Sequence, residues 1–193
     1  MEQPFVVYPT TGTVVNPLVN TDHQLAVRNP FDGMFQPDVK HQEMVSKYKR
    51  FLPIALAVAA MSKDKSSKFG ALILGPGFEI RSSGWNGAPR GCKADDDARF
   101  DVRSEKYMWV AHAEANAIVN AARTGTALEG CTLLVNGPPC MGCAKLIVQA
   151  GIKRVLVTKP KPDFYERWKE DIDRARALFS ECGVECIEFD TKE

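Results

Sequence analysis

Three residues with metal-binding side chains lie in two short segments of the chain. His112 is in the segment His-Ala-Glu, and Cys140 and Cys143 are in the segment Pro-Cys-Met-Gly-Cys. Two thiolates and one neutral imidazole balance the charge of Zn²⁺ and leave one tetrahedral position for water. A closed structural site needs a fourth protein ligand, and no second Cys or His lies close to either segment. The pattern therefore predicts a catalytic zinc site, where the metal lowers the pKa of bound water to about 7.

Glu114 adds a carboxylate that is not a metal ligand. It lies two residues after His112, where it could take a proton from the water and pass it to a ring nitrogen and a departing amine. The order His-x-Glu followed by Pro-Cys-x-x-Cys is the signature of zinc enzymes that deaminate nucleobases. These residues predict hydrolytic deamination, with Glu114 as the proton shuttle.

Backbone groups beside the two segments are candidates to hold a base. If a helix begins at His-Ala-Glu, its first N–H groups are unpaired, and the N–H of Ala113 can donate to a base carbonyl. Pro138 precedes another proline, so its carbonyl cannot join a helix and is suited to accept from the substrate amino group.

These cysteines have two alternative interpretations besides an open catalytic site. A Cys-x-x-Cys pair alone also suits a redox dithiol. A different class is a binding protein in which zinc only stabilises the fold. Glu114 discriminates against that class, because a structural metal has no use for a carboxylate beside an open position.

Composition narrows the class of protein. A length of 193 residues with 45% hydrophobic residues predicts one globular domain of ordinary core size. A net charge of +1 disfavours a nucleic-acid partner but is compatible with a small anionic substrate. We see neither a signal peptide nor an apolar run of about 18 residues, so we expect a cytoplasmic protein with no membrane partner. Its six cysteines should stay reduced.

The chain divides into two parts by pattern. Residues 1–42 contain five prolines and no sustained period, and we interpret them as an irregular leader or strap lying partly against the body or a neighbouring subunit. Residues 43–193 form the catalytic domain. Expected elements are a helix 43–62, a hairpin of strands 69–74 and 79–83, a loop 93–106, helices 111–123, 140–150 and 165–181, and strands 132–136, 154–158 and 184–189. Their alternation predicts an α/β fold, a three-layer α/β/α sandwich.

Longer segments around these residues resemble the deoxycytidylate (dCMP) deaminase family. The similarity covers roughly residues 45–190 and leaves the leader unmatched. The matching segments are His112-Ala-Glu-Ala-Asn-Ala-Ile118, Gly137-Pro-Pro-Cys-Met-Gly-Cys-Ala-Lys145, Gln149-Ala-Gly-Ile152, Ser62-Lys-Asp64, Phe69-Gly-Ala71 and Gly84-Trp-Asn-Gly-Ala-Pro-Arg-Gly91.

The resemblance implies a cytidine-deaminase-like sandwich with a mixed central sheet, and conversion of dCMP and water to dUMP and ammonia, which supplies thymidylate precursors. It implies a homo-oligomer, often a hexamer. By the same resemblance His112, Cys140 and Cys143 bind one Zn²⁺, Glu114 is the acid and base, and Asn86 hydrogen-bonds the sugar or base.

Regulation is implied as well, since many members are activated by dCTP and inhibited by dTTP. The implied allosteric residues are Gly84, Trp85, Asn86 and Gly87, and Mg²⁺ would accompany a triphosphate effector. A tight turn that uses glycine for backbone freedom is the structural alternative. The chain departs from the family at Trp85, where tyrosine is common, and at Lys65, where proline is common. It also lacks the histidines that bind an extra structural zinc in some members.

A monophosphate substrate needs hydrogen-bond donors. The predicted donors are Lys63, Lys65, Ser66 and Lys68, between the first expected helix and strand, and Arg167 in the last helix. The alternative is that these lysines are simply solvated in a surface loop and bind no phosphate. The identity of the base is a further alternative. A small change in pocket volume could admit dCMP that carries a 5-methyl or 5-hydroxymethyl group. Deaminases of free nucleosides, bases or tRNA would share the zinc and the glutamate.

Overall fold

The computed structural model describes residues 39–92 and 101–191. Most of the predicted leader, 1–42, lies outside these residues, and the division at residue 42 stays a prediction. Within 39–92 and 101–191, every helix is too short or too polar to span a membrane.

A mixed sheet of five strands forms the centre of the molecule. Its order is β2 (Ile80–Trp85), β1 (Gly70–Leu74), β3 (Thr132–Val135), β4 (Arg154–Thr158) and β5 (Glu185–Phe189). Strand β1 is antiparallel to β2 and β3, whereas β3, β4 and β5 are parallel. The central strands are short apolar runs buried throughout, as expected for a sheet covered on both faces. The predicted hairpin and mixed sheet are confirmed.

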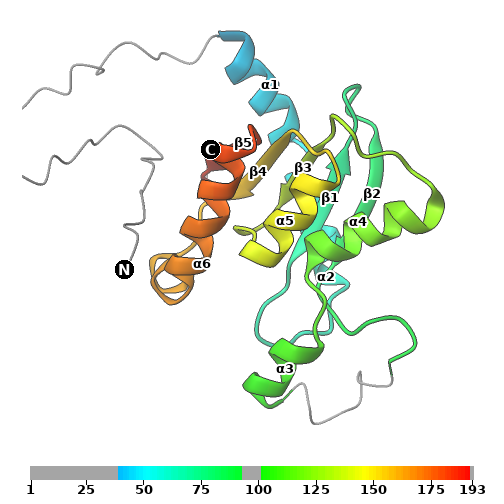
Figure 1. Cartoon of the computed structure of the whole chain (residues 1–193), viewed down its shortest axis with the longest axis vertical. Helices are drawn as coiled ribbons and strands as arrows, with labels where there is room; N and C mark the ends of the chain where they lie inside the picture. The colour runs from blue at the N-terminus through cyan, green and yellow to red at the C-terminus, as the bar shows by residue number, and fades with distance from the viewer. Residues whose placement is uncertain (1–38, 93–100, 192–193) are drawn as a thin grey trace, which may run out of the picture.

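Helices cover both faces of this sheet. Helices α4 (Ala113–Thr124), α5 (Met141–Gln149) and α6 (Pro162–Glu181) lie in front of it in Figure 1, and α2 (Leu52–Ala60) lies behind. Successive side chains of a strand point to opposite faces of the sheet, so the core has two parts. Ala71 and Ile73 pack with α4, α5 and α6. Leu72 packs on the other face with α2 and with Tyr48 of α1 (Val39–Lys49). The predicted three-layer sandwich is confirmed.

The single helix predicted over 43–62 is wrong. The chain forms α1 and α2, which are separated at Arg50 and Phe51. Pro53 explains the break, because it has no N–H to donate and its ring clashes with the carbonyl four residues earlier, that of Lys49. Proline is well accommodated in the first turn of a helix, and Pro53 occupies that place in α2.

The loop predicted over 93–106 is wrong at its end. Residues 103–106 belong to a short helix, α3 (Arg103–Trp109), and residues 93–100 lie outside the described part. None of the residues of α3 is buried, and its apolar residues Tyr107, Met108 and Trp109 are consecutive, so they form no stripe of helical period that could reveal it. Contacts with other segments hold α3 in place.

Candidate active site

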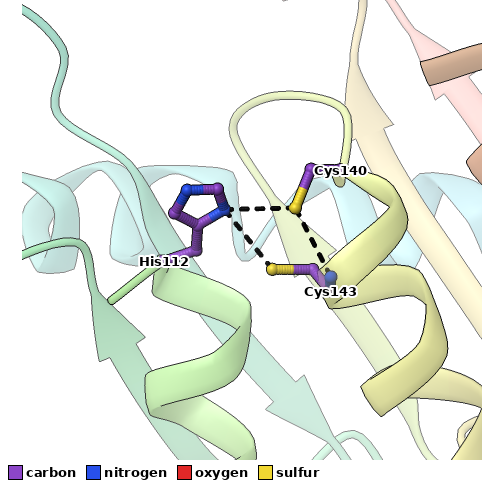
Figure 2. A group of neighbouring side chains, drawn as sticks. All are labelled: His112, Cys140 and Cys143. Carbon is purple, nitrogen blue, oxygen red and sulfur yellow. Dashed lines mark hydrogen bonds between the residues drawn. The ribbon is translucent and has the colours of Figure 1, made fainter. Parts of the chain in front are cut away.

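Two helix starts bring the predicted metal ligands together. His112 is the N-cap of α4 and Cys140 is the N-cap of α5, both with extended backbone (ψ 157° and 167°). The backbone N–H of Cys143 donates to Sγ of Cys140 at 3.4 Å, so this thiol caps its own helix. Figure 2 shows the imidazole facing both sulfur atoms. Unpaired N–H groups at helix starts favour negative charge, which suits thiolates.

The three ligand atoms have the spacing of a zinc site. Nδ1 of His112 lies 3.3 Å from Sγ of Cys140 and 3.5 Å from Sγ of Cys143. All three atoms lie within 4.8 Å of one another. Tetrahedral zinc, with its usual bonds to nitrogen and sulfur, places those two ligand atoms about 3.6 Å apart. The residues therefore fit Zn²⁺ in both number and spacing.

Hydrogen bonds among these three side chains shift their pKa values. Its hydrogen bond to Cys140 raises the pKa of His112 to about 9, although burial opposes the shift. The hydrogen bond with Cys143 lowers the pKa of Cys140, and the same contact, together with burial, raises the pKa of Cys143.

Glu114 lies in the first turn of α4 and is 5% exposed. Burial raises its pKa to about 7, although the charge of His112 and the neighbouring Cys143 thiol act in the opposite direction. A carboxyl group with a pKa near neutrality can both accept and donate a proton at that pH. Its environment therefore suits acid and base chemistry.

A cavity of about 480 Å³ opens in front of these residues. His112, Ala113, Glu114, Pro138 and Cys140 all line it. Four aromatic rings line another part, with successive centroids 6.1, 6.4 and 5.5 Å apart: Phe69, Phe164, Trp168 and Tyr107. Such rings offer faces and edges on which a planar base or a sugar can pack.

The structure brings some of the predicted substrate residues to this cavity and leaves others outside it. Lys65, Ser66, Asn86 and Arg167 are among the lining residues, whereas Lys63 and Lys68 are not. The carbonyl of Lys68 instead accepts from Nδ2 of Asn136 at 3.0 Å.

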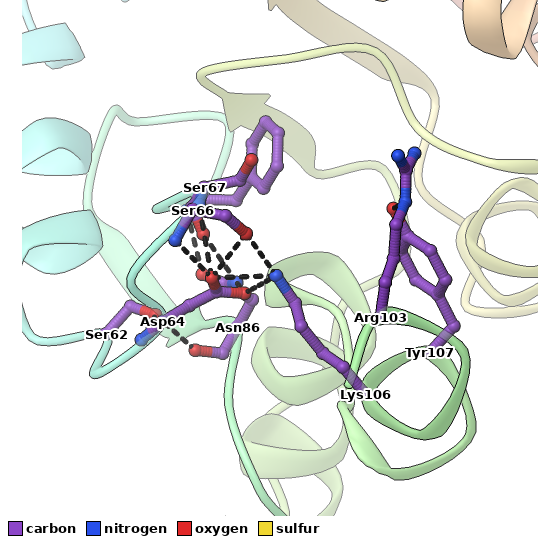
Figure 3. Close-up of polar contacts among 9 residues, drawn as sticks. Ser62, Asp64, Ser66, Ser67, Asn86, Arg103, Lys106 and Tyr107 are labelled. Atoms are coloured by element: carbon purple, nitrogen blue, oxygen red, sulfur yellow. Dashed lines mark hydrogen bonds and ion pairs between the residues drawn. The ribbon is translucent and has the colours of Figure 1, made fainter. Parts of the chain in front are cut away.

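Asn86 reaches the cavity with its amide donors already engaged. Nδ2 donates to Oδ2 of Asp64 at 3.2 Å and to the carbonyl of Ser67 at 2.9 Å. Oδ1 accepts from the N–H of Phe69 at 2.8 Å. In this arrangement Asn86 shapes the 64–69 loop (Figure 3), and a bond to a ligand would use the second lone pair of Oδ1.

In the predicted allosteric turn, residues 84–87, packing alone explains why one position is glycine. A Cβ atom on Gly84 would lie 2.3 Å from the backbone nitrogen of Ala117, so close packing of β2 on α4 requires glycine. Trp85 is 40% exposed, and its carbonyl accepts from Asn116 at 2.7 Å. Neither Gly84, Trp85 nor Gly87 lines the cavity. Their role in regulation stays a prediction.

Sequence reasoning missed a polar cluster on one wall. Nζ of Lys106, on α3, lies 2.7 Å from Oδ2 and 2.8 Å from Oδ1 of Asp64, and it also donates to Ser66 (Figure 3). Arg103 and Tyr107 line the cavity from the same helix. The available signal was Asp64 in the Ser-Lys-Asp segment, but its partner lies in the stretch expected to be a loop.

Comparison with known proteins agrees with this geometry. The model of the cytidine and deoxycytidylate deaminase zinc-binding region matches residues 45–159. An uncharacterized deaminase in the luxG 3′ region of Aliivibrio fischeri is 43% identical over 74% of this chain and 93% of that protein. Human deoxycytidylate deaminase is 38% identical over 72% of this chain and 77% of its own. A dCMP deaminase from cyanophage S-TIM5, solved with dCMP and dUMP, matches at a TM-score of 0.58 and 25% identity, over 76% of this chain and 97% of the phage chain.

Proposed function

This chain belongs to the cytidine and deoxycytidylate deaminase family, and we propose that it converts dCMP and water to dUMP and ammonia. One observation carries the proposal: the two thiols, the imidazole and the buried Glu114 meet at one cavity. The similarity to proteins named deoxycytidylate deaminases supports dCMP as the substrate.

Each predicted residue has a role in this reaction. His112, Cys140 and Cys143 would hold Zn²⁺, which when bound supplies a Lewis acid that makes water ionise near neutral pH. Glu114 takes the proton from the attacking water and delivers it to the ring nitrogen and then to the amino group, which leaves as ammonia. The N–H of Ala113, at the first position of α4, donates to the base carbonyl. The carbonyl of Pro138 accepts from the amino group.

For binding of the sugar and the phosphate we propose Asn86, Lys65, Ser66 and Arg167, which line the cavity. Lys63 and Lys68 would have to act from outside the lining residues.

Assembly and regulation are further proposals. We propose a homo-oligomer, with a hexamer favoured; Ile54, Leu56 and Met61, exposed on or beside α2, support burial of that surface between subunits. Control by dCTP and dTTP through Gly84, Trp85, Asn86 and Gly87, with Mg²⁺ bound to the effector, is also proposed. A cytoplasmic location stays a prediction.

The test is ammonia release by the zinc-loaded protein from dCMP, 5-methyl-dCMP, 5-hydroxymethyl-dCMP, deoxycytidine, dCTP and tRNA. We expect the highest kcat/KM with dCMP. A higher value with a 5-substituted nucleotide would assign the chain to that substrate, and a higher value with deoxycytidine or tRNA would contradict the proposal. Repeating the dCMP assay with added dCTP or dTTP tests regulation.

A further inference from the structure

Among the described residues, four side chains with cationic groups other than imidazole line the cavity, and three of them lie against carboxylates. Lys106 pairs with Asp64, and Lys65 lies 2.8 Å from Asp101. Arg167 lies 3.6 Å from Asp163. The fourth, Arg103, forms no ion pair with any residue of 39–92 or 101–191. Within the part of the chain that the structure describes, Arg103 is therefore the lining cation whose charge no carboxylate partner offsets.

The Arg103 guanidinium is held by one neighbour. Its centre lies 5.6 Å from the centroid of the Tyr107 ring, and its Nε donates to the Tyr107 hydroxyl at 3.1 Å. Tyr107 in turn meets Trp168 edge to face at 5.5 Å. These contacts engage the face and the Nε of the group, and neither terminal amino group has a hydrogen-bond partner within 39–92 or 101–191. Two parallel N–H donors are the arrangement that binds two oxygens of a phosphate.

The helix that carries Arg103 is fixed to the rest of the site. α3 has seven residues, too few for stability as an isolated helix, and it buries none of them. Lys106, one turn after Arg103, is tied to Asp64 and Ser66 (Figure 3). Asp64 also accepts from the backbone N–H groups of Ser66 and Ser67. The cluster therefore holds α3, and with it Arg103, against the 64–69 loop.

Burial changes across the cavity in the direction that a nucleotide requires. Glu114 is buried, whereas Arg103 is exposed. A base can therefore reach the reacting groups while a doubly charged phosphate stays near water, where its desolvation is small. We propose that Arg103 binds the 5′-phosphate of the substrate and thereby selects a nucleotide over a nucleoside. This inference rests on the proposed function.

The test compares zinc-loaded wild type with Arg103→Gln and Arg103→Lys, using dCMP and deoxycytidine. For Arg103→Gln we expect KM for dCMP to rise by roughly ten- to a hundredfold, with kcat nearly unchanged, because the lost contact is equal in the ground and transition states. The kcat/KM for deoxycytidine should not change. Arg103→Lys should show a smaller rise in KM, since lysine keeps the positive charge but lacks the two parallel N–H donors of the guanidinium. Arg123→Gln, at an exposed position in the last turn of α4, is the matched control and should match wild type.

Two results would overturn the role of Arg103. An unchanged KM for dCMP in Arg103→Gln would place the phosphate elsewhere, and an equal loss with dCMP and deoxycytidine would make Arg103 a structural residue. Wild-type turnover separates the two proposals. If wild type deaminates dCMP, these results overturn only the role of Arg103; if it does not, the proposed function itself is wrong.

Discussion

At the scale of single residues, Glu114 is placed at a cost to folding. A buried carboxylate is disfavoured, and here burial raises the pKa to about 7. Retaining an ionisable group at a place with so little water is characteristic of a residue that transfers protons.

Glu114→Gln should therefore separate chemistry from structure. The amide keeps the shape of the side chain but cannot accept the proton, so we expect kcat to fall by roughly 10³-fold or more, with one zinc per chain retained. Kinetics of ammonia release together with metal analysis check this. Cys143→Ala is the contrasting variant and should lose metal and activity together. Substantial turnover by Glu114→Gln, or full zinc occupancy in Cys143→Ala, would refute the assigned roles.

Residues of the site differ in how far sequence can predict them. His112 lies 28 positions before Cys140, but the two short segments together form a known signature, which is enough to predict that their ligand atoms meet, and these atoms lie within 4.8 Å of one another. Lys106 gains its role from Asp64, which is 42 positions away. No local pattern marks such a pair, because the contact exists only after the 64–69 loop and α3 have been brought together by folding.

At the scale of elements, helices and strands with a pattern in their own sequence are predictable, whereas those that depend on distant contacts are not. Strands such as β3 and β4 are short apolar runs, and α4 and α5 follow clear start signals, so their patterns carry the information. α3 has no buried face and depends on the Asp64–Lys106 pair. Asp64 and Lys106 have side chains only 4% and 14% exposed, so removal of one leaves the other charge buried and unpaired.

Asp64→Asn and Lys106→Met should each reduce the free energy of unfolding by roughly 3 kcal/mol at pH 7. The double variant should lose less than the sum of the two, because neither charge is then left alone. Lys65→Met is the matched control. It breaks the exposed pair with Asp101 (83% and 61% exposed) and should cost less than about 1 kcal/mol. Urea unfolding measures all four; additive losses in the double variant would show that the pair does not couple.

The effect of Asp64→Asn should also depend on pH. Burial acts to raise the pKa of Asp64, but hydrogen bonds from Lys106, Ser66 and Ser67 outweigh it and leave the pKa below its usual 3.8. A depressed pKa in the folded state means that the stabilisation is complete above pH 3.8 and is lost as the pH falls through the folded value. The difference between wild type and Asp64→Asn should therefore be constant near neutrality and shrink below pH 3.8.

At the scale of the whole molecule, the metal site lies at the starts of α4 and α5, next to the core cluster that contains Ala113 and Ala144. Both buried clusters are built from the sheet and the helices on its two faces, and neither includes His112, Cys140 or Cys143. Most of the apolar core is therefore built without the ligands, and we expect the sheet to persist when the metal is removed.

Removal of zinc by a chelator should accordingly abolish ammonia release while leaving the far-UV circular dichroism of the folded protein at 25 °C. Because zinc binds the native state alone, its loss should lower Tm, by roughly 10 °C for a chain of this size. Added zinc should restore both Tm and activity. Cys143→Ala is the control: its Tm should match that of the chelated wild type and should not respond to the chelator. Unfolding of the wild type on chelation at 25 °C would instead show that the metal is structural and that the fold depends on it.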